Sequence, residues 1–177
     1  MSLPPVTAPF VAATVLLGAA GVAKTMRPGD TVNALRAAGI PANRALVRVG
    51  AIAEVGLAAW ALLAPGPLSG ALVAVAYTIF AVFVVLALKR GWALASCGCF
   101  GRPDTPPTVA HAVLNAGAAA SAVWWAAAWP GGPGWSHLGR LVFHQPWHGL
   151  PLAFVTLVVT GMAYLVWTNP LPAVQRQ

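Results

Sequence analysis

Long apolar stretches alternate with short polar segments along the whole chain. A helix needs about 20 apolar residues to cross the hydrocarbon core of a bilayer, and an open strand would leave backbone groups unpaired in lipid. The pattern therefore predicts one all-α integral membrane domain over residues 1–177, a polytopic helical bundle of about five transmembrane helices (a four-helix core plus one). The predicted spans are residues 6–23, 45–64, 68–88, 109–129 and 150–167.

The composition supports this class and excludes others. Hydrophobic residues make up 59% of the chain and charged residues only 7%, whereas a soluble domain is about one quarter charged. An ordinary soluble enzyme and a disordered segment are therefore excluded, and the lipid bilayer is the expected surrounding. Lys and Arg outnumber Asp and Glu by 10 to 3, but the basic residues stand singly between apolar runs. No nucleic-acid partner is expected, because they form no patch or reading motif.

The basic residues also predict an orientation in the membrane. Cytoplasmic loops carry an excess of Lys and Arg. In a five-helix arrangement, only Arg140 falls on one side. The opposite side receives Lys24, Arg27, Arg36, Arg44, Arg48, Lys89, Arg90, Arg102 and Arg176. This bias predicts a multi-pass protein of the plasma (inner) membrane with its N-terminus outside, its C-terminus in the cytoplasm, and the third connection, residues 89–108, on the cytoplasmic face.

Both cysteines, Cys97 and Cys99, lie in this connection with a single glycine between them. Paired cysteines on a cytoplasmic surface are usually redox or metal sites rather than structural staples. A disulfide across one intervening residue closes a small ring, and strain in such a ring makes the bond easier to reduce. Neighbouring basic residues such as Arg102 would stabilise a thiolate. We interpret the pair as a reversible redox dithiol, with metal binding and an inert pair as the alternatives.

Polar residues inside the predicted spans are the other candidates for chemistry. Glu54 is the acidic residue within a span, and a carboxylate in the membrane is costly enough to indicate a function. Its two candidate roles are relay of a proton released by thiol oxidation and a helix–helix hydrogen bond to Lys24 or Asn115. His111 and Asn115 stand four residues apart, on one face of the fourth predicted helix. His111 is also the best-placed third metal ligand, because two sulfurs do not complete a zinc or copper site.

With these residues the chain resembles the MauE family of methylamine-utilisation membrane proteins, within the DoxX-like group of small helical membrane proteins. The resemblance covers most of the chain. It rests on Gly21-x-x-Lys24 followed by Gly39-Ile40-Pro41, on Glu54 with Gly56, on the run Cys97-Gly98-Cys99-Phe100-Gly101, and on Asn115. It implies a membrane accessory protein that helps a thioredoxin-like partner form disulfides in exported proteins. The DsbB and VKOR oxidoreductases, a loose analogy, use two cysteine pairs, so here a second protein or a bound quinone would complete the electron transfer.

The resulting interpretation is a membrane thiol–disulfide redox protein whose Cys97 and Cys99 exchange with a thioredoxin-like partner. Glu54 and His111 would handle protons, and Lys24, Arg102 and Asn115 are further pocket candidates. Quinone is the candidate cofactor, although no motif identifies one. Two alternatives stay open: a metal-handling membrane protein that binds through Cys97, Cys99 and His111, and a non-catalytic accessory subunit. Whether the protein is an enzyme also stays open, and a cytoplasmic cysteine pair conflicts with disulfide formation in exported proteins.

Overall fold

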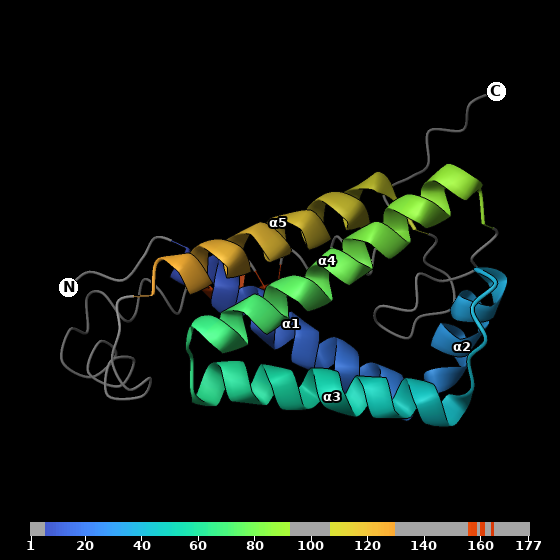
Figure 1. Ribbon diagram of the computed structural model, residues 1–177, viewed down its shortest axis with the longest axis horizontal. Coiled ribbons are helices and arrows are strands. Elements are labelled where there is room, and N and C mark those ends of the chain that lie inside the picture. The colour runs from blue at the N-terminus through green and yellow to red at the C-terminus, as the bar shows by residue number, and fades with distance from the viewer. Residues whose placement is uncertain (1–5, 93–106, 130–155, 159, 162–163, 165–177) are drawn as a thin grey trace.

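The computed structural model describes residues 6–92, 107–129, 156–158, 160–161 and 164, and within these residues every regular element is a helix. Five main helices lie within the described residues, and Figure 1 shows how they are arranged. They are α1 (Thr7–Met26), α2 (Pro28–Ala37), α3 (Arg44–Leu63), α4 (Pro67–Arg90) and α5 (Val109–Ala127). The first four predicted spans thus coincide with α1, α3, α4 and α5. Most of the predicted span 150–167 lies outside the described residues.

Local signals in the sequence explain where several of these helices begin and end. Asn43 precedes α3, and its side-chain oxygen accepts a hydrogen bond from the backbone N–H of Leu46 at 2.8 Å, which satisfies a donor of the first turn. Pro67 occupies the first position of α4, where a missing N–H costs nothing. Gly91 ends α4 with a φ of +59°, a left-handed conformation that favours glycine.

The short helix α2 lies in a segment that the apolar pattern predicted only as a connection. It has 10 residues, with Pro28 at its start, Asp30 in its first turn and Arg36 in its last. A negative charge near the N-terminal end of a helix and a positive charge near its C-terminal end interact favourably with the helix dipole. Pro28, Val32 and Ala34 are buried, and Ala34 packs beside Ala87 near the end of α4. The apolar positions of α2 are few and interrupted by polar ones, so its sequence does not have the pattern of a membrane span.

Glycines allow the helices to pack closely in two pairs. A Cβ atom at Gly21 would lie 2.8 Å from the carbonyl oxygen of Ala51, so the backbones of α1 and α3 come close together there. A Cβ atom at Gly70 would lie 3.0 Å from the Trp125 ring, which brings α4 against α5. Such small-residue contacts are typical of helices packed in membranes. The two pairs are joined in the core, where the ring of Phe10 from α1 stacks on Trp125 at a centroid distance of 4.8 Å.

Three of the described helices, α1, α3 and α4, are long and apolar enough to cross a membrane. The chain is therefore a multi-pass membrane protein. Large apolar side chains cover the outer faces of α3 and α4, as expected for surfaces that lipid covers. They include Val49, Ile52, Leu63, Leu72, Val75, Ile79 and Val82. α5 covers the predicted fourth span but is not one of these three helices. That α5 crosses the membrane therefore stays a prediction.

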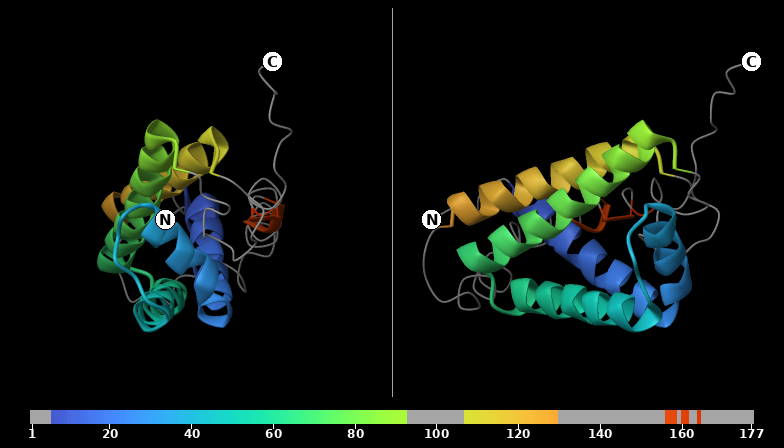
Figure 2. Two further views of the ribbon diagram at one scale, coloured as in Figure 1. Left: turned by 90° about the vertical axis from the view of Figure 1, so that its right-hand side faces the viewer. Right: turned by 45° about the vertical axis from the view of Figure 1, so that its right-hand side comes forward.

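One end of the bundle collects the described basic residues. The C-terminal ends of α1 and α4 lie there with α2 and the N-terminal ends of α3 and α5 (Figures 1 and 2). We call it the basic end. Its described basic residues are Lys24, Arg27, Arg36, Arg44, Arg48, Lys89 and Arg90. The clustering agrees with the loop assignment that underlies the predicted orientation, while the side of the membrane that this end faces is still a prediction.

Candidate functional site

A buried ion pair joins α1 to α3. The ammonium group of Lys24 donates hydrogen bonds to both carboxylate oxygens of Glu54, each at 2.7 Å. The two side chains are only 8% and 18% exposed. Charges inside a membrane protein are costly unless they are paired in this way. The contact brings together two residues that lie 30 positions apart in the sequence.

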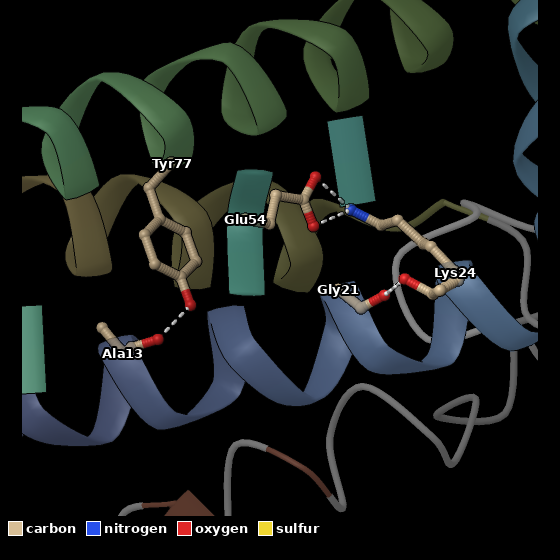
Figure 3. A network of polar contacts seen from close by, with 6 residues as sticks. Ala13, Gly21, Lys24, Glu54 and Tyr77 are labelled. Carbon is tan, nitrogen blue, oxygen red and sulfur yellow. Dashed lines mark hydrogen bonds and ion pairs between the residues drawn. The ribbon is translucent and has the colours of Figure 1, made fainter. Parts of the chain in front are cut away.

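The direction of the Lys24 side chain is informative. Lys24 lies two residues before the end of α1, where a lysine ordinarily extends its ammonium toward the membrane surface. Instead the side chain runs back along α1, and its ammonium points at the carboxylate of Glu54 (Figure 3). Glu54 lies in the middle of α3, ten residues after Arg44, the first residue of that helix. The pair therefore sits inside the bundle and not at its rim.

Two neighbours make this arrangement possible. Gly21 lies one turn before Lys24, and the close approach of α3 at that glycine brings Glu54 within reach. On the other side, the Lys24 nitrogen lies 4.5 Å from the centre of the Phe80 ring in α4. A cation over an aromatic face is stabilised by the ring quadrupole. Three helices thus contribute to the site, and the aromatic member, Phe80, was not among the residues predicted from sequence.

A cavity of about 250 Å³ opens beside the ion pair. Its walls come mainly from α2, α3 and α4, with Lys24 and Glu54 as the charged lining residues. The other lining residues are Thr31, Leu35, Leu46, Val47, Gly50, Ala51, Ile79, Phe80 and Phe83. Sequence reasoning missed this cavity because its apolar residues are indistinguishable from ordinary span residues. The spacing of Phe80 and Phe83, which places both on one face of α4, was the one available signal.

A second polar group lies at the start of α5. His111 is 1% exposed. Its Nδ1 atom lies 2.7 Å from the hydroxyl oxygen of Thr108 and 3.2 Å from the Thr108 backbone nitrogen. Its Nε2 atom is buried and has no hydrogen-bond partner among the described residues. The Asn115 side chain donates to the His111 carbonyl oxygen at 2.8 Å, so these two residues interact along their own helix.

The tautomer of His111 decides what Nε2 offers. If Nδ1 carries the proton and donates it to the Thr108 hydroxyl, Nε2 presents a lone pair that can accept a proton or bind a metal. If Nδ1 instead accepts the Thr108 backbone N–H, Nε2 carries the proton and is a donor. Both contacts are short enough for a hydrogen bond. The Thr108 backbone N–H points at Nδ1, so this arrangement favours Nδ1 as the acceptor and Nε2 as the N–H group.

The sequence-predicted residues fall into three sets. Lys24 and Glu54 are in direct contact. His111 and Asn115 form a separate contact on α5. Cys97, Cys99 and Arg102 lie outside the described residues, in the segment between the end of α4 and the start of α5. Within the described ranges, no three His, Cys, Asp or Glu residues gather as a metal site would require.

Comparison with known proteins assigns the chain to a family. The family model described as methylamine utilisation protein MauE matches residues 2–128. This range includes all five helices α1–α5 and the segment with both cysteines. Because it is more than half of the chain, the protein belongs to the MauE family. Comparison with curated proteins and with solved structures gave no match.

Proposed function

We propose that this member of the MauE family serves methylamine utilisation as a membrane thiol–disulfide redox protein that uses Cys97 and Cys99. The observation that carries the proposal is the pair itself: the two cysteines of the chain stand one residue apart. Their segment follows α4 and precedes α5, and the adjoining ends of those two helices lie at the basic end. Positive charge near a cysteine favours the reactive thiolate.

The chemistry is a two-electron exchange with a thioredoxin-like partner. A thiolate of the reduced partner attacks one sulfur of the Cys97–Cys99 disulfide, which forms a mixed disulfide and releases the other cysteine as a thiolate. The second thiol of the partner then attacks the mixed disulfide. The partner leaves oxidised, and the cysteine pair holds two electrons and takes up two protons. The reverse sequence of steps reduces an oxidised partner.

Basic residues on both sides of the cysteine pair would support this exchange. Arg102 is three residues beyond Cys99, directly after Gly101, and Lys89 and Arg90 end the helix that precedes the pair. Their positive charge would stabilise the thiolate that attacks or leaves.

Two groups of the bundle are suited to the protons of the exchange. His111 follows the cysteine segment in the sequence and has a buried ring nitrogen, which suits it to proton transfer. Glu54 is a further proton acceptor, and Lys24 holds its carboxylate in place. In this proposal His111 exchanges protons with the cysteines, and Glu54 serves as a reserve acceptor deeper in the bundle.

The orientation of the protein is part of the proposal. The charge bias favours a cytoplasmic position for the basic end and the cysteine pair. A cytoplasmic pair would draw on cytoplasmic thiols and pass reducing equivalents outward, whereas an outward-facing pair would oxidise exported proteins. Labelling of intact cells with membrane-impermeant and membrane-permeant thiol reagents, before and after reduction, distinguishes the two and reports the redox state of the pair.

Substitution of the cysteines tests the exchange itself. In the reverse direction, the thiol that remains in Cys97→Ser or Cys99→Ser attacks an oxidised thioredoxin-like partner, and the chain then has no second cysteine to release the partner in its reduced form. We therefore expect one of the two variants to accumulate a covalent complex with the partner. The double variant should form none, and Ser121→Cys, which adds a thiol at a distant position of α5, should not restore it. Full methylamine utilisation by both single variants would contradict the proposal and favour a non-catalytic accessory subunit.

One observation favours a second candidate function, metal handling through Cys97, Cys99 and His111. The buried Nε2 atom of His111 has no partner among the described residues, and an imidazole with two thiolates is a common zinc or copper ligand set. Purified protein would then bind one equivalent of Zn²⁺ or Cu⁺, and both Cys97→Ser and His111→Gln would abolish binding. Retention of the metal by both variants would exclude this function.

A further inference from the structure

The cavity beside the Lys24–Glu54 pair has the size of a small-molecule site. Its volume is about 250 Å³, and a cavity of about 150 Å³ already accommodates benzene. One ring with several substituents therefore fits. Most of its wall is apolar, and the ion pair supplies charged groups at one place. Apolar walls with a few placed polar groups are typical of ligand sites.

The ion pair restricts the charge of the ligand. Lys24 and Glu54 neutralise each other at 2.7 Å. An anion near the ammonium would meet the Glu54 carboxylate, and a cation near the carboxylate would meet Lys24. A neutral head group with oxygen atoms avoids both conflicts. An ammonium has three donors, of which two are used on Glu54, so a ligand oxygen can accept the third, and a ligand hydroxyl can donate to the carboxylate.

The aromatic wall restricts the shape. Phe80 and Phe83 both line the cavity, and each is half-buried. Aromatic faces pair well with flat rings. At the rim, Leu46 and Ile79 are 57% and 60% exposed. They lie on α3 and α4, two of the helices that can cross a membrane. Because lipid is the expected surrounding of the outer faces of these helices, a ligand that enters past these side chains would come from lipid.

We infer that this cavity binds a neutral, membrane-soluble molecule whose head is a flat ring with oxygen substituents, the chemistry of quinones and quinols. The inference concerns binding alone and does not rest on the thiol exchange proposed above. A second cavity, of about 360 Å³, lies between α1, α4 and α5. It has no charged residue among its lining side chains, so it offers no comparable anchor for an oxygen-bearing head.

Gly50 and Gly56 provide a matched pair of variants for the test. Gly50 lines the cavity, and a Cβ atom there would meet nothing within 4 Å, so Gly50→Leu fills the cavity without straining the helix. Gly56 lies on the same helix, is equally open, and is not a lining residue. The full chain in phosphatidylcholine nanodiscs is titrated with a decyl-tailed benzoquinone, with quenching of tryptophan fluorescence as the readout.

We expect saturable binding that Gly50→Leu weakens by about tenfold or more, since the leucine side chain occupies the space that the ring needs. Gly56→Leu should bind as the wild type does. A photoreactive azidoquinone should label α3 or α4 near Gly50 and Phe80. Absence of saturable binding, equal affinity of the two variants, labelling confined to other helices, or displacement by anionic lipid but not by quinol would overturn the inference.

A cysteine variant distinguishes a failure of this inference from a failure of the proposed thiol exchange. The double variant Cys97→Ser/Cys99→Ser should bind the benzoquinone with wild-type affinity. Binding without any thiol exchange in the wild type would refute the exchange and leave the cavity assignment intact. Thiol exchange by a wild-type protein that binds no quinone would refute the cavity assignment and leave the proposed exchange intact.

Discussion

The buried ion pair yields an asymmetric prediction about stability. Replacing Lys24 with methionine leaves the Glu54 carboxylate in the middle of α3 without its partner. Replacing Glu54 with glutamine leaves Lys24 in the last turn of α1, where its long side chain can turn outward to the membrane surface. We therefore expect Lys24→Met to destabilise the protein more than Glu54→Gln does.

The structure sets the size of the effect. Removing one partner of a buried pair costs about 3–5 kcal/mol. The Glu54 side chain is 18% exposed and borders a cavity, which favours the lower end of that range. A loss of about 3 kcal/mol lowers the ratio of folded to unfolded protein about 150-fold. For Glu54→Gln we expect about 1 kcal/mol, comparable with one lost hydrogen bond.

Unfolding in mixed micelles, followed by circular dichroism at rising fractions of denaturing detergent, measures both costs. The double variant Lys24→Met/Glu54→Gln serves as the control, because it leaves no unpaired charge at the site. It should be more stable than Lys24→Met alone. The reasoning would be refuted if the two single variants lost equal free energy of unfolding. It would also be refuted if the double variant lost the sum of the two single losses.

Three further predictions concern the packing of the helices. Gly21→Ala should cost about 1–3 kcal/mol, because its Cβ atom would lie 2.8 Å from the Ala51 carbonyl oxygen. Gly56→Ala, at an open position, is the control in the same unfolding assay, and a harmless Gly21→Ala would contradict the close approach of α1 and α3. Tyr77→Phe removes the hydrogen bond from the Tyr77 hydroxyl to the Ala13 carbonyl oxygen at 2.6 Å and should cost about 0.5–1.5 kcal/mol. Asn43→Ala removes the cap of α3 and should cost about 0.5–2 kcal/mol, with Asn43→Asp retaining most of the stability.

Much of the architecture can be read from local patterns. Each apolar stretch that is long enough to span a membrane predicted a helix, and α1, α3, α4 and α5 begin and end within a few residues of the expected limits. This succeeds because the hydrogen bonds of a helix join residues four positions apart. The helix α2 was missed since its 10 residues are too few and too polar to satisfy a criterion based on bilayer thickness.

The candidate site was only partly predictable. Glu54, Lys24, His111 and Asn115 stand out as polar residues in an apolar chain, but their grouping does not follow from that fact. The sequence left Lys24 and Asn115 as alternative partners for Glu54. In the structure Glu54 pairs with Lys24, whereas Asn115 bonds to the carbonyl oxygen of His111.

The amino-acid order alone therefore determined that this chain forms apolar helices, with most basic residues near the ends of the apolar stretches and two cysteines in the segment between two of them. Tertiary structure alone decided that Lys24 turns inward, that Phe80 covers it, and that a cavity opens beside Gly50. The reason is physical. Helix formation depends on neighbours along the chain, while a site between helices depends on how two surfaces cross, and that crossing is set by close contacts such as the one at Gly21.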